Sequence, residues 1–309
     1  MEIAISALLA GAGLALLCVG GGRLVGGGVS VARRLGMSPL VIGMTIVAYG
    51  TSTPELAASI AAGPEHGAIV IGNVVGSNIA NIGMVIGIAS IMAPLAIGAR
   101  ALRREVPLMF GFAVLLVALS ADGELSRIDG VLLLGALVAF AVHTCTSARR
   151  AGSAPADQGR AQVSVPRSVA NIAVGIVALY VGATLTIDNA VVIASSLGLS
   201  EKVIGITVVA IGTSLPELIT SVIAIRRGQP DIGVGSIIGS NICNILLITG
   251  VASAAFTIGV DGDIFVDYAI MIAFGAFLLV AARTGKIGRG PGAGAVAAYA
   301  VYLATLAFR

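Results

Sequence analysis

The sequence predicts an all-α membrane protein of ten transmembrane helices, arranged as two five-helix repeats of inverted topology. Three observations lead to this fold class. Of the 309 residues, 57% are hydrophobic and only 11% are charged, whereas soluble domains carry roughly 25% charged residues. Apolar runs long enough to cross a bilayer, which takes ~20 residues, recur along the chain. A long pattern of apolar and polar residues also occurs twice.

The candidate spans are apolar runs bounded by charged, Gly-rich or Pro-rich residues. They divide five and five around one polar segment, which is rich in Ala, Gly, Ser, Pro and Arg and is typical of a flexible linker. We expect a first five-helix repeat at residues 1–146, a linker at 147–167 and a second five-helix repeat at 168–309. The ten spans are residues 3–33, 39–62, 67–93, 105–121, 128–147, 168–198, 202–225, 231–257, 264–282 and 291–308.

The internal repeat covers two blocks in each half. Residues 35–60 align with residues 197–222 without a gap and with more than half of the positions identical, including GTSTPE at 50–55 and GTSLPE at 212–217. A second block, GNVVGSNIANI at 72–82, matches GSIIGSNICNI at 235–245. Because five is an odd number of spans, the second half must cross the membrane in the opposite sense to the first.

The distribution of Lys and Arg predicts the orientation. With the N-terminus outside, most basic residues and the linker lie in the cytoplasm, and the outer loops carry acidic residues instead. Both termini are then outside, in a multi-pass protein of the cell (inner) membrane. The net charge of +3 is scattered between spans, which indicates a topology signal and no nucleic-acid partner. The lipid bilayer is the expected surrounding, and no obligate protein partner is evident.

Glu55 and Glu217 lie in the middle of predicted spans. An ionised carboxylate there costs at least a few kcal/mol, and neither the GTSTPE stretch at 50–55 nor the GTSLPE stretch at 212–217 contains Lys or Arg. Protonated or salt-bridged glutamates that hold helices together are one interpretation. Bound cations are the interpretation that the surrounding residues favour.

Those residues supply oxygen atoms at helical spacing. Thr51 and Glu55 are four residues apart and share a helix face, and Ser52 is three residues from the same glutamate. Oxygen ligands suit hard cations such as Na⁺ and Ca²⁺ and argue against Zn²⁺ or copper. The remaining side chains of this pattern are Thr213, Ser214, Ser77, Asn81, Ser240 and Asn244.

Each block also contains a proline that exposes backbone oxygens. Pro54 and Pro216 have no N–H, which frees a carbonyl one turn earlier and weakens the helix. The carbonyls of Ala48 and Ala210 are further candidate ligands. Two ionised carboxylates about 4 Å apart would repel by roughly 4 kcal/mol at an effective dielectric constant of 20. An empty site should therefore hold a proton, whereas one Ca²⁺ would neutralise both glutamates.

The whole chain resembles the sodium/calcium exchangers of prokaryotes, within the calcium/cation antiporter superfamily. The ten spans, the central linker and the repeated GTS-x-PE and GS-N-x-x-N motifs carry this resemblance. It implies a central Ca²⁺ site made by Glu55 and Glu217 with the carbonyls of Thr51 and Thr213. The flanking Na⁺ sites would use Ala48, Ser52 and Ser77, or Ala210, Ser214 and Ser240, and Asn81 and Asn244 would complete the centre.

The implied function is antiport of Na⁺ for Ca²⁺ by alternating access, with the long first and sixth helices sliding across the others. Ca²⁺ and Na⁺ would be transported substrates, and no tightly bound cofactor is expected. A H⁺/Ca²⁺ antiporter, or one for another divalent cation, is the alternative on the same fold. A channel-like or structural membrane protein is a rival from another class. An enzyme is disfavoured, because no Ser/His pair or HExxH motif occurs in a span.

Overall fold

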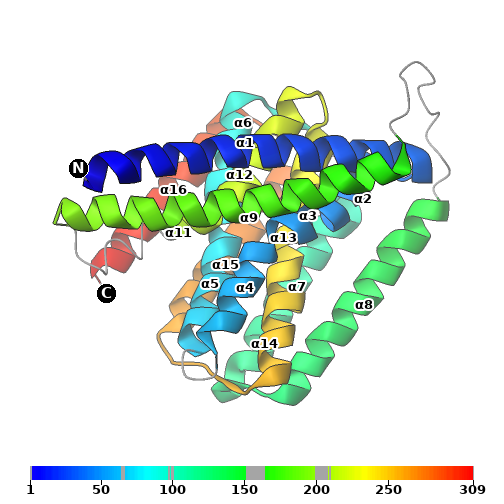
Figure 1. The fold of residues 1–309 in the computed structure, drawn as a ribbon. Coiled ribbons are helices and arrows are strands. Elements are labelled where there is room, and N and C mark those ends of the chain that lie inside the picture. Colours follow the sequence, from blue (N-terminus) through cyan, green and yellow to red (C-terminus); the bar gives the residue numbers. More distant parts are fainter. Residues whose placement is uncertain are drawn as a thin grey trace.

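A computed structural model describes residues 2–63, 67–96, 98, 101–150, 164–198, 208 and 210–308. These residues are almost entirely helical, as predicted (Figure 1). Seven of the described helical segments are long and apolar enough to cross a membrane, and Pro39–Thr51 is a shorter apolar one. The seven are Ile3–Ala32, Gly67–Met92, Arg103–Asp122, Arg127–Thr144, Val165–Ser196, Pro230–Ala255 and Ile264–Ala281.

The first half contains two helical stretches that are interrupted by π-helical turns (η). Ser38 accepts a hydrogen bond from the backbone of Val41 and begins the second of the predicted spans, with Pro39 at the first helical position. The elements are α1 Glu2–Leu35, α2 Pro39–Ile42, η1 Gly43–Val47, α3 Ala48–Thr51, α4 Thr53–Ala62, α5 Gly67–Ala80, η3 Asn81–Ile86, α6 Gly87–Met92, η4 Ala101–Glu105, α7 Val106–Leu119, η5 Ser120–Asp122 (a 3₁₀ turn) and α8 Arg127–Arg150.

The second half repeats this order of elements within the part that the structure describes. Its elements are α9 Val165–Ser196, α11 Ala210–Thr213, α12 Leu215–Arg226, α13 Pro230–Cys243, η7 Asn244–Ile248, α14 Thr249–Ala255, α15 Ile264–Arg283 and α16 Arg289–Phe308. The middle of the predicted linker, 151–163, and the beginning of the predicted seventh span, 202–207, lie outside the described residues.

The two longest helices, α1 and α9, lie side by side and antiparallel across the remaining helices (Figure 1). Glycines spaced seven residues apart allow their backbones to touch: Gly13 faces Gly182 and Gly20 faces Gly175. A Cβ at any of these positions would meet backbone atoms of the partner helix. Such close approach at small residues is typical of packed transmembrane helices.

Two short antiparallel strand pairs connect the halves, and the sequence did not predict them. β1 Leu95–Ala96 pairs with β4 Lys286–Ile287, and β2 Glu124–Leu125 pairs with β3 Ile258–Gly259. In both sheets one strand comes from each half of the chain. The pairs therefore tie the ends of helices from one half to those of the other.

The two most deeply enclosed stretches are Gly67–Met92 and Pro230–Ala255, whose apolar windows are 83% and 94% buried. They contain the GNVVGSN and GSIIGSN blocks. Around them pack α2 to α4, α7, α12, α15 and α16. Polar side chains on these central stretches are thus removed from both water and lipid, and each must find a partner within the protein or in a ligand.

Candidate ion-binding site

Both GTS-x-PE blocks form a break between two helices. Ser52 separates α3 from α4, with φ −81° and ψ 5°, and Ser214 separates α11 from α12, with φ −91° and ψ 3°. The helix resumes after each serine with a proline, Pro54 or Pro216, in its first turn, where a missing N–H costs no hydrogen bond. The break places Glu55 in the first turn of α4 and Glu217 in the first turn of α12.

The predicted polar ligands are buried, with the partial exception of Thr213, which is half-buried. The exposed fractions of the Glu55 and Glu217 side chains are 1% and 0%. The elements that carry them cross in the centre of the molecule: η3 packs against α12 and α13, and η7 packs against α4 and α5. The other buried ligands are Thr51, Ser52, Ser77, Asn81, Ser214, Ser240 and Asn244.

A chain of side-chain hydrogen bonds joins the two halves at this crossing. The Ser240 hydroxyl donates to Oε1 of Glu217 at 3.0 Å, and its oxygen lies 2.7 Å from that of Ser52. The side chains of Thr51 and Ser52 also interact with the Glu217 carboxylate, and Glu55 is close enough to repel it. Residues far apart in the sequence thus surround one pair of carboxylates.

Several oxygen atoms in this cluster have no hydrogen-bond partner among the described residues. They include one carboxylate oxygen of each glutamate, Oε2 of Glu55 and Oε2 of Glu217. The others are Oδ1 of Asn81, Oγ of Ser214 and Oδ1 of Asn244. Buried polar atoms without partners are costly. Two carboxylates with amide and hydroxyl oxygens form a donor set that fits Ca²⁺ or Na⁺.

The donor atoms of the predicted ligands are oxygens. Within the described part of the chain, no group of three or more His, Cys, Asp or Glu residues is placed to hold a metal ion. A zinc or copper centre would require imidazole or thiolate ligands. The site instead offers the oxygen ligands that the sequence predicted.

The predicted backbone ligand Ala48 already accepts hydrogen bonds, unlike the side-chain oxygens that have no partner. The carbonyl of Ala48 accepts from the Ser52 backbone N–H at 2.9 Å and from the Thr51 hydroxyl at 3.1 Å. A cation at this oxygen would replace the Thr51 hydroxyl, which can rotate away. The corresponding Ala210 begins α11, and Thr213 ends it.

Asn241 is a site residue that the sequence analysis did not single out. Its Oδ1 accepts a hydrogen bond of 2.9 Å from Nδ2 of Asn81, and its own Nδ2 lies 3.5 Å from the sulfur of Met109. Asn241 holds the amide nitrogen of Asn81. The side-chain oxygen of Asn81, which has no partner among the described residues, therefore points away from Asn241. The signal was present in the sequence, since the GSN repeat duplicates this asparagine as Asn78.

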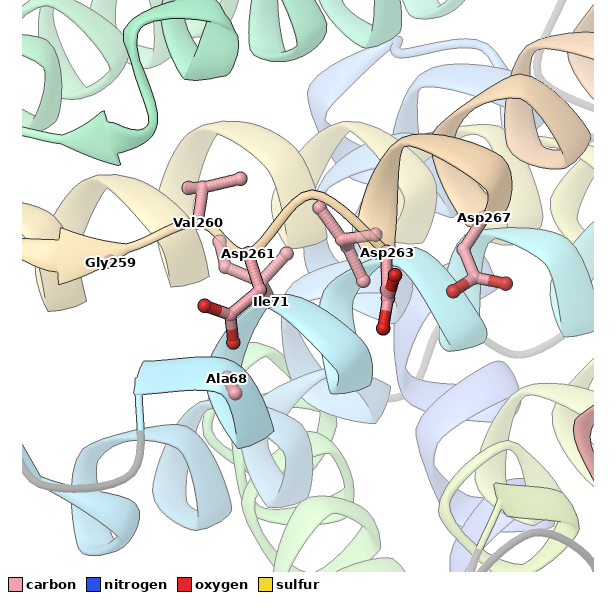
Figure 2. A pocket seen from close by; sticks show the side chains of 8 residues that line it. Ala68, Ile71, Gly259, Val260, Asp261, Asp263 and Asp267 are labelled. Atoms are coloured by element: carbon pink, nitrogen blue, oxygen red, sulfur yellow. The ribbon is translucent and has the colours of Figure 1, made fainter. Parts of the chain in front are cut away.

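The acidic loop before α15, together with the first turn of α15, is a separate feature. Asp261, Asp263 and Asp267 line a cavity of about 160 Å³ with Ala68 and Ile71 of α5 (Figure 2). None of the predicted ion ligands lines this cavity. Asp261 and Asp263 are exposed.

The family model of the sodium/calcium exchanger protein matches residues 5–146 and 167–308. The chain therefore belongs to the sodium/calcium exchanger family, and it is a multi-pass membrane protein. It is 35% identical to the inner membrane protein YrbG of Escherichia coli over 306 residues, 95% of this chain and 94% of YrbG. It is also 33% identical to the sodium/calcium exchanger MaX1 of Methanosarcina acetivorans, over 95% of this chain and 96% of MaX1.

The fold matches that of a solved relative. A structure of the sodium-calcium exchanger NCX_Mj, soaked with Na⁺ and Sr²⁺, superimposes with a TM-score of 0.85 and 34% sequence identity. The match covers 98% of this chain and 99% of that one. This chain thus shares the architecture of a sodium-calcium exchanger over nearly all of its length.

Proposed function

We propose that this protein is a secondary active antiporter that exchanges Na⁺ for Ca²⁺ and extrudes Ca²⁺ from the cell. The observation that carries the proposal is the pair of buried carboxylates, Glu55 and Glu217, each with one oxygen that lacks a partner among the described residues. Membership of the exchanger family and the names of MaX1 and NCX_Mj support the choice of ions.

The architecture of the proposal is ten transmembrane helices in two inverted five-helix repeats, residues 1–146 and 168–309. Three features support it. The family model matches the chain in two segments of equal length. The order of elements from α5 to α8 recurs from α13 to α16. Strand β1 of the first half corresponds to β3 of the second, and β2 corresponds to β4. Because β1 pairs with β4 and β2 pairs with β3, a two-fold axis in the membrane plane would relate one strand pair to the other.

The proposed ligand assignment is the one that the resemblance to the exchanger family implies. Glu55 and Glu217, with the carbonyls of Thr51 and Thr213, form the central Ca²⁺ site, and Asn81 and Asn244 complete it. One Na⁺ site uses Ala48, Ser52 and Ser77, and the other uses Ala210, Ser214 and Ser240. The bonded pair Ser52 and Ser240 supports a close relation between the two Na⁺ sites and the glutamates.

Coupling follows from the shared carboxylates. Two glutamates balance the charge of one Ca²⁺, so Ca²⁺ and Na⁺ cannot both be bound at full occupancy. A ligand shifts the equilibrium between inward- and outward-facing states only through its different affinities for them. The glycine contacts bring the backbones of α1 and α9 together, which supports a motion of these two helices as one unit across the others.

The proposed orientation places both termini outside and the linker in the cytoplasm of the inner membrane. The ends of α8 and α12 carry Arg149, Arg150, Arg226 and Arg227, and the loop before α15 together with the first turn of α15 carries three aspartates. This asymmetry satisfies the positive-inside rule. The name of the relative YrbG supports the location.

The test is uptake of radioactive Ca²⁺ by proteoliposomes. Vesicles loaded with Na⁺ and diluted into Na⁺-free buffer should accumulate Ca²⁺, and vesicles loaded with choline at the same pH should not. Equal uptake under both conditions would overturn the choice of Na⁺. Uptake driven by a pH gradient alone would indicate H⁺/Ca²⁺ exchange.

A further inference from the structure

A groove on the surface lies apart from the ion site, between α7 and α8. It has a volume of about 560 Å³ and is open to the surroundings. The lining residues come from the beginning of α7, from the turn η4 before it and from α8: Arg103, Arg104, Pro107, Leu108, Gly111, Phe112, Leu115 and His143. None of the predicted ion ligands is among them.

The groove has a basic end and an apolar body. Arg103 and Arg104 are exposed, as is His143 on α8. Below them, Pro107, Leu108, Gly111, Phe112 and Leu115 form one stripe along α7, at positions that share a helix face. From Pro107 to Leu115 the stripe extends about 12 Å at 1.5 Å per residue, most of the roughly 15 Å depth of one leaflet.

The other face of α7 is turned into the protein. Val106, Met109, Ala113 and Leu116 are buried, and Glu105, 1% exposed, does not line the groove. No acidic side chain is among the lining residues. The charge at the mouth of the groove is therefore positive.

The helix α8 stands at the edge of the molecule, and its end towards the linker leans away from the other helices (Figure 1). It packs on α14 and η7 near the ion site. A space between α7 and α8 is thus left open on the side where α8 leads into the linker. A Cβ at Gly111 would meet no described atom within 4 Å, so the groove is unfilled there.

We propose that this groove binds an anionic phospholipid of the leaflet on the linker side. The phosphate lies between the guanidinium groups of Arg103 and Arg104, and one acyl chain lies along the stripe from Pro107 to Leu115. Arginine pairs bind phosphate through charge-assisted hydrogen bonds, and basic pockets between transmembrane helices bind anionic head groups. The proposal depends on the membrane placement of α7 and α8 and is independent of which ions are exchanged.

The test is native mass spectrometry of the full-length protein titrated with dioleoyl phosphatidylglycerol. The variant R103Q/R104Q should lower the affinity by about 30-fold, because each basic residue near an anionic membrane surface contributes ~1 kcal/mol. The matched control is R226Q/R283Q, which removes two exposed arginines outside the groove and should leave binding unchanged. Equal losses in the two variants would overturn the proposal.

A second pair of variants tests the apolar body of the groove. G111L fills the open space on α7, whereas G135L adds the same side chain on α8, where a Cβ also meets no described atom. G111L should weaken phosphatidylglycerol binding and G135L should not. Glycerol 3-phosphate, which has no acyl chain, should fail to compete. Competition as strong as that of the lipid would make this a site for free phosphate compounds.

The wild-type protein provides a test that needs no variant. Photoactivatable phosphatidylglycerol with the reactive group on an acyl chain should label peptides of α7 around residues 107–115. Phosphatidylcholine with the same reactive group should label them several-fold less. Labelling spread evenly over the lipid-facing helices, or equal labelling by both lipids, would contradict the assignment.

Discussion

In the first half of the chain, the amide of Asn81 donates to Asn241, and the hydroxyl of Ser52 lies 2.7 Å from that of Ser240. In the second half, the corresponding side-chain atoms of Asn244 and Ser214 have no partner among the described residues. The two halves thus share a motif but differ in its hydrogen bonds. The duplicated sequence places the same polar side chains in both halves. The conformation decides which of these side chains form hydrogen bonds within the protein.

A site that binds and releases cations is best served by a partial set of internal hydrogen bonds. If both sets of oxygens were satisfied internally, the site would have little affinity for a cation; if neither were, burial would be more costly. In the present conformation the oxygens without partners include those of Ser214 and Asn244 and one from each glutamate. The variants below test whether the difference between the halves has functional consequences.

The largest expected effect comes from the glutamates, where the halves should behave alike. Glu55→Gln and Glu217→Gln should each lower Ca²⁺ uptake by more than about 100-fold. Substituting a residue that merely contacts a metal ligand already lowers metal affinity or activity by about 10–100-fold. Uptake by proteoliposomes, normalised to the amount of inserted protein, measures this. Glu124→Gln, at an exposed position, is the control. Retained uptake in either glutamate variant would remove that residue from the site.

Serine variants should reveal a functional difference between the two halves. Ser240→Ala removes the hydrogen bond to Glu217 and the contact with Ser52, and should raise the KM for Ca²⁺ about tenfold, since a hydrogen bond to a charged group contributes ~1.5–3 kcal/mol. Ser77→Ala, the corresponding change in the first half, should have a smaller effect on Ca²⁺. Identical KM values for the two variants would show that the asymmetry does not persist during transport.

The smallest expected effect concerns Asn241. Asn241→Ala releases the amide of Asn81 and should raise the KM for Ca²⁺ a few-fold, in the range of a neutral hydrogen bond of ~0.5–1.5 kcal/mol. Asn78→Ala is the matched change in the other half, where the Asn78 amide donates to the Val74 carbonyl instead.

A double variant distinguishes orientation from simple packing. In Asn81→Asp both terminal atoms are oxygens, so the direction of the group no longer matters. Adding Asn241→Ala to Asn81→Asp should therefore cause no further rise in KM. A further rise equal to that in the wild-type background would show that Asn241 acts through packing.

The sequence predicts the helical character of the chain and the limits of several spans well, because composition and apolar length are properties of single segments. Residues 39–62 and 67–93 correspond to α2–α4 and α5–α6 almost to the residue. The strand pairs and the π-helical turns were not predictable, since they depend on contacts between halves and on local hydrogen-bond geometry. The span at 202–225 can be compared with the structure only from residue 208 onwards.

The candidate site was predictable to the extent that it is repeated. Glu55, Ser52 and Asn81 stand out because the second half carries the same residues in the same order. The contact of Ser52 with Ser240 and the role of Asn241 require knowledge of which helices cross, which the linear pattern does not contain. The ligand assignment itself remains a prediction.

The most direct test of the account is equilibrium binding of radioactive Ca²⁺ to the purified protein, with Na⁺ as the competitor. The shared-site account predicts one Ca²⁺ bound per chain, displaced completely by Na⁺, and no binding by Glu217→Gln. Ca²⁺ that stays bound at saturating Na⁺, or that binds unchanged to Glu217→Gln, would contradict the claim that one pair of carboxylates serves both ions.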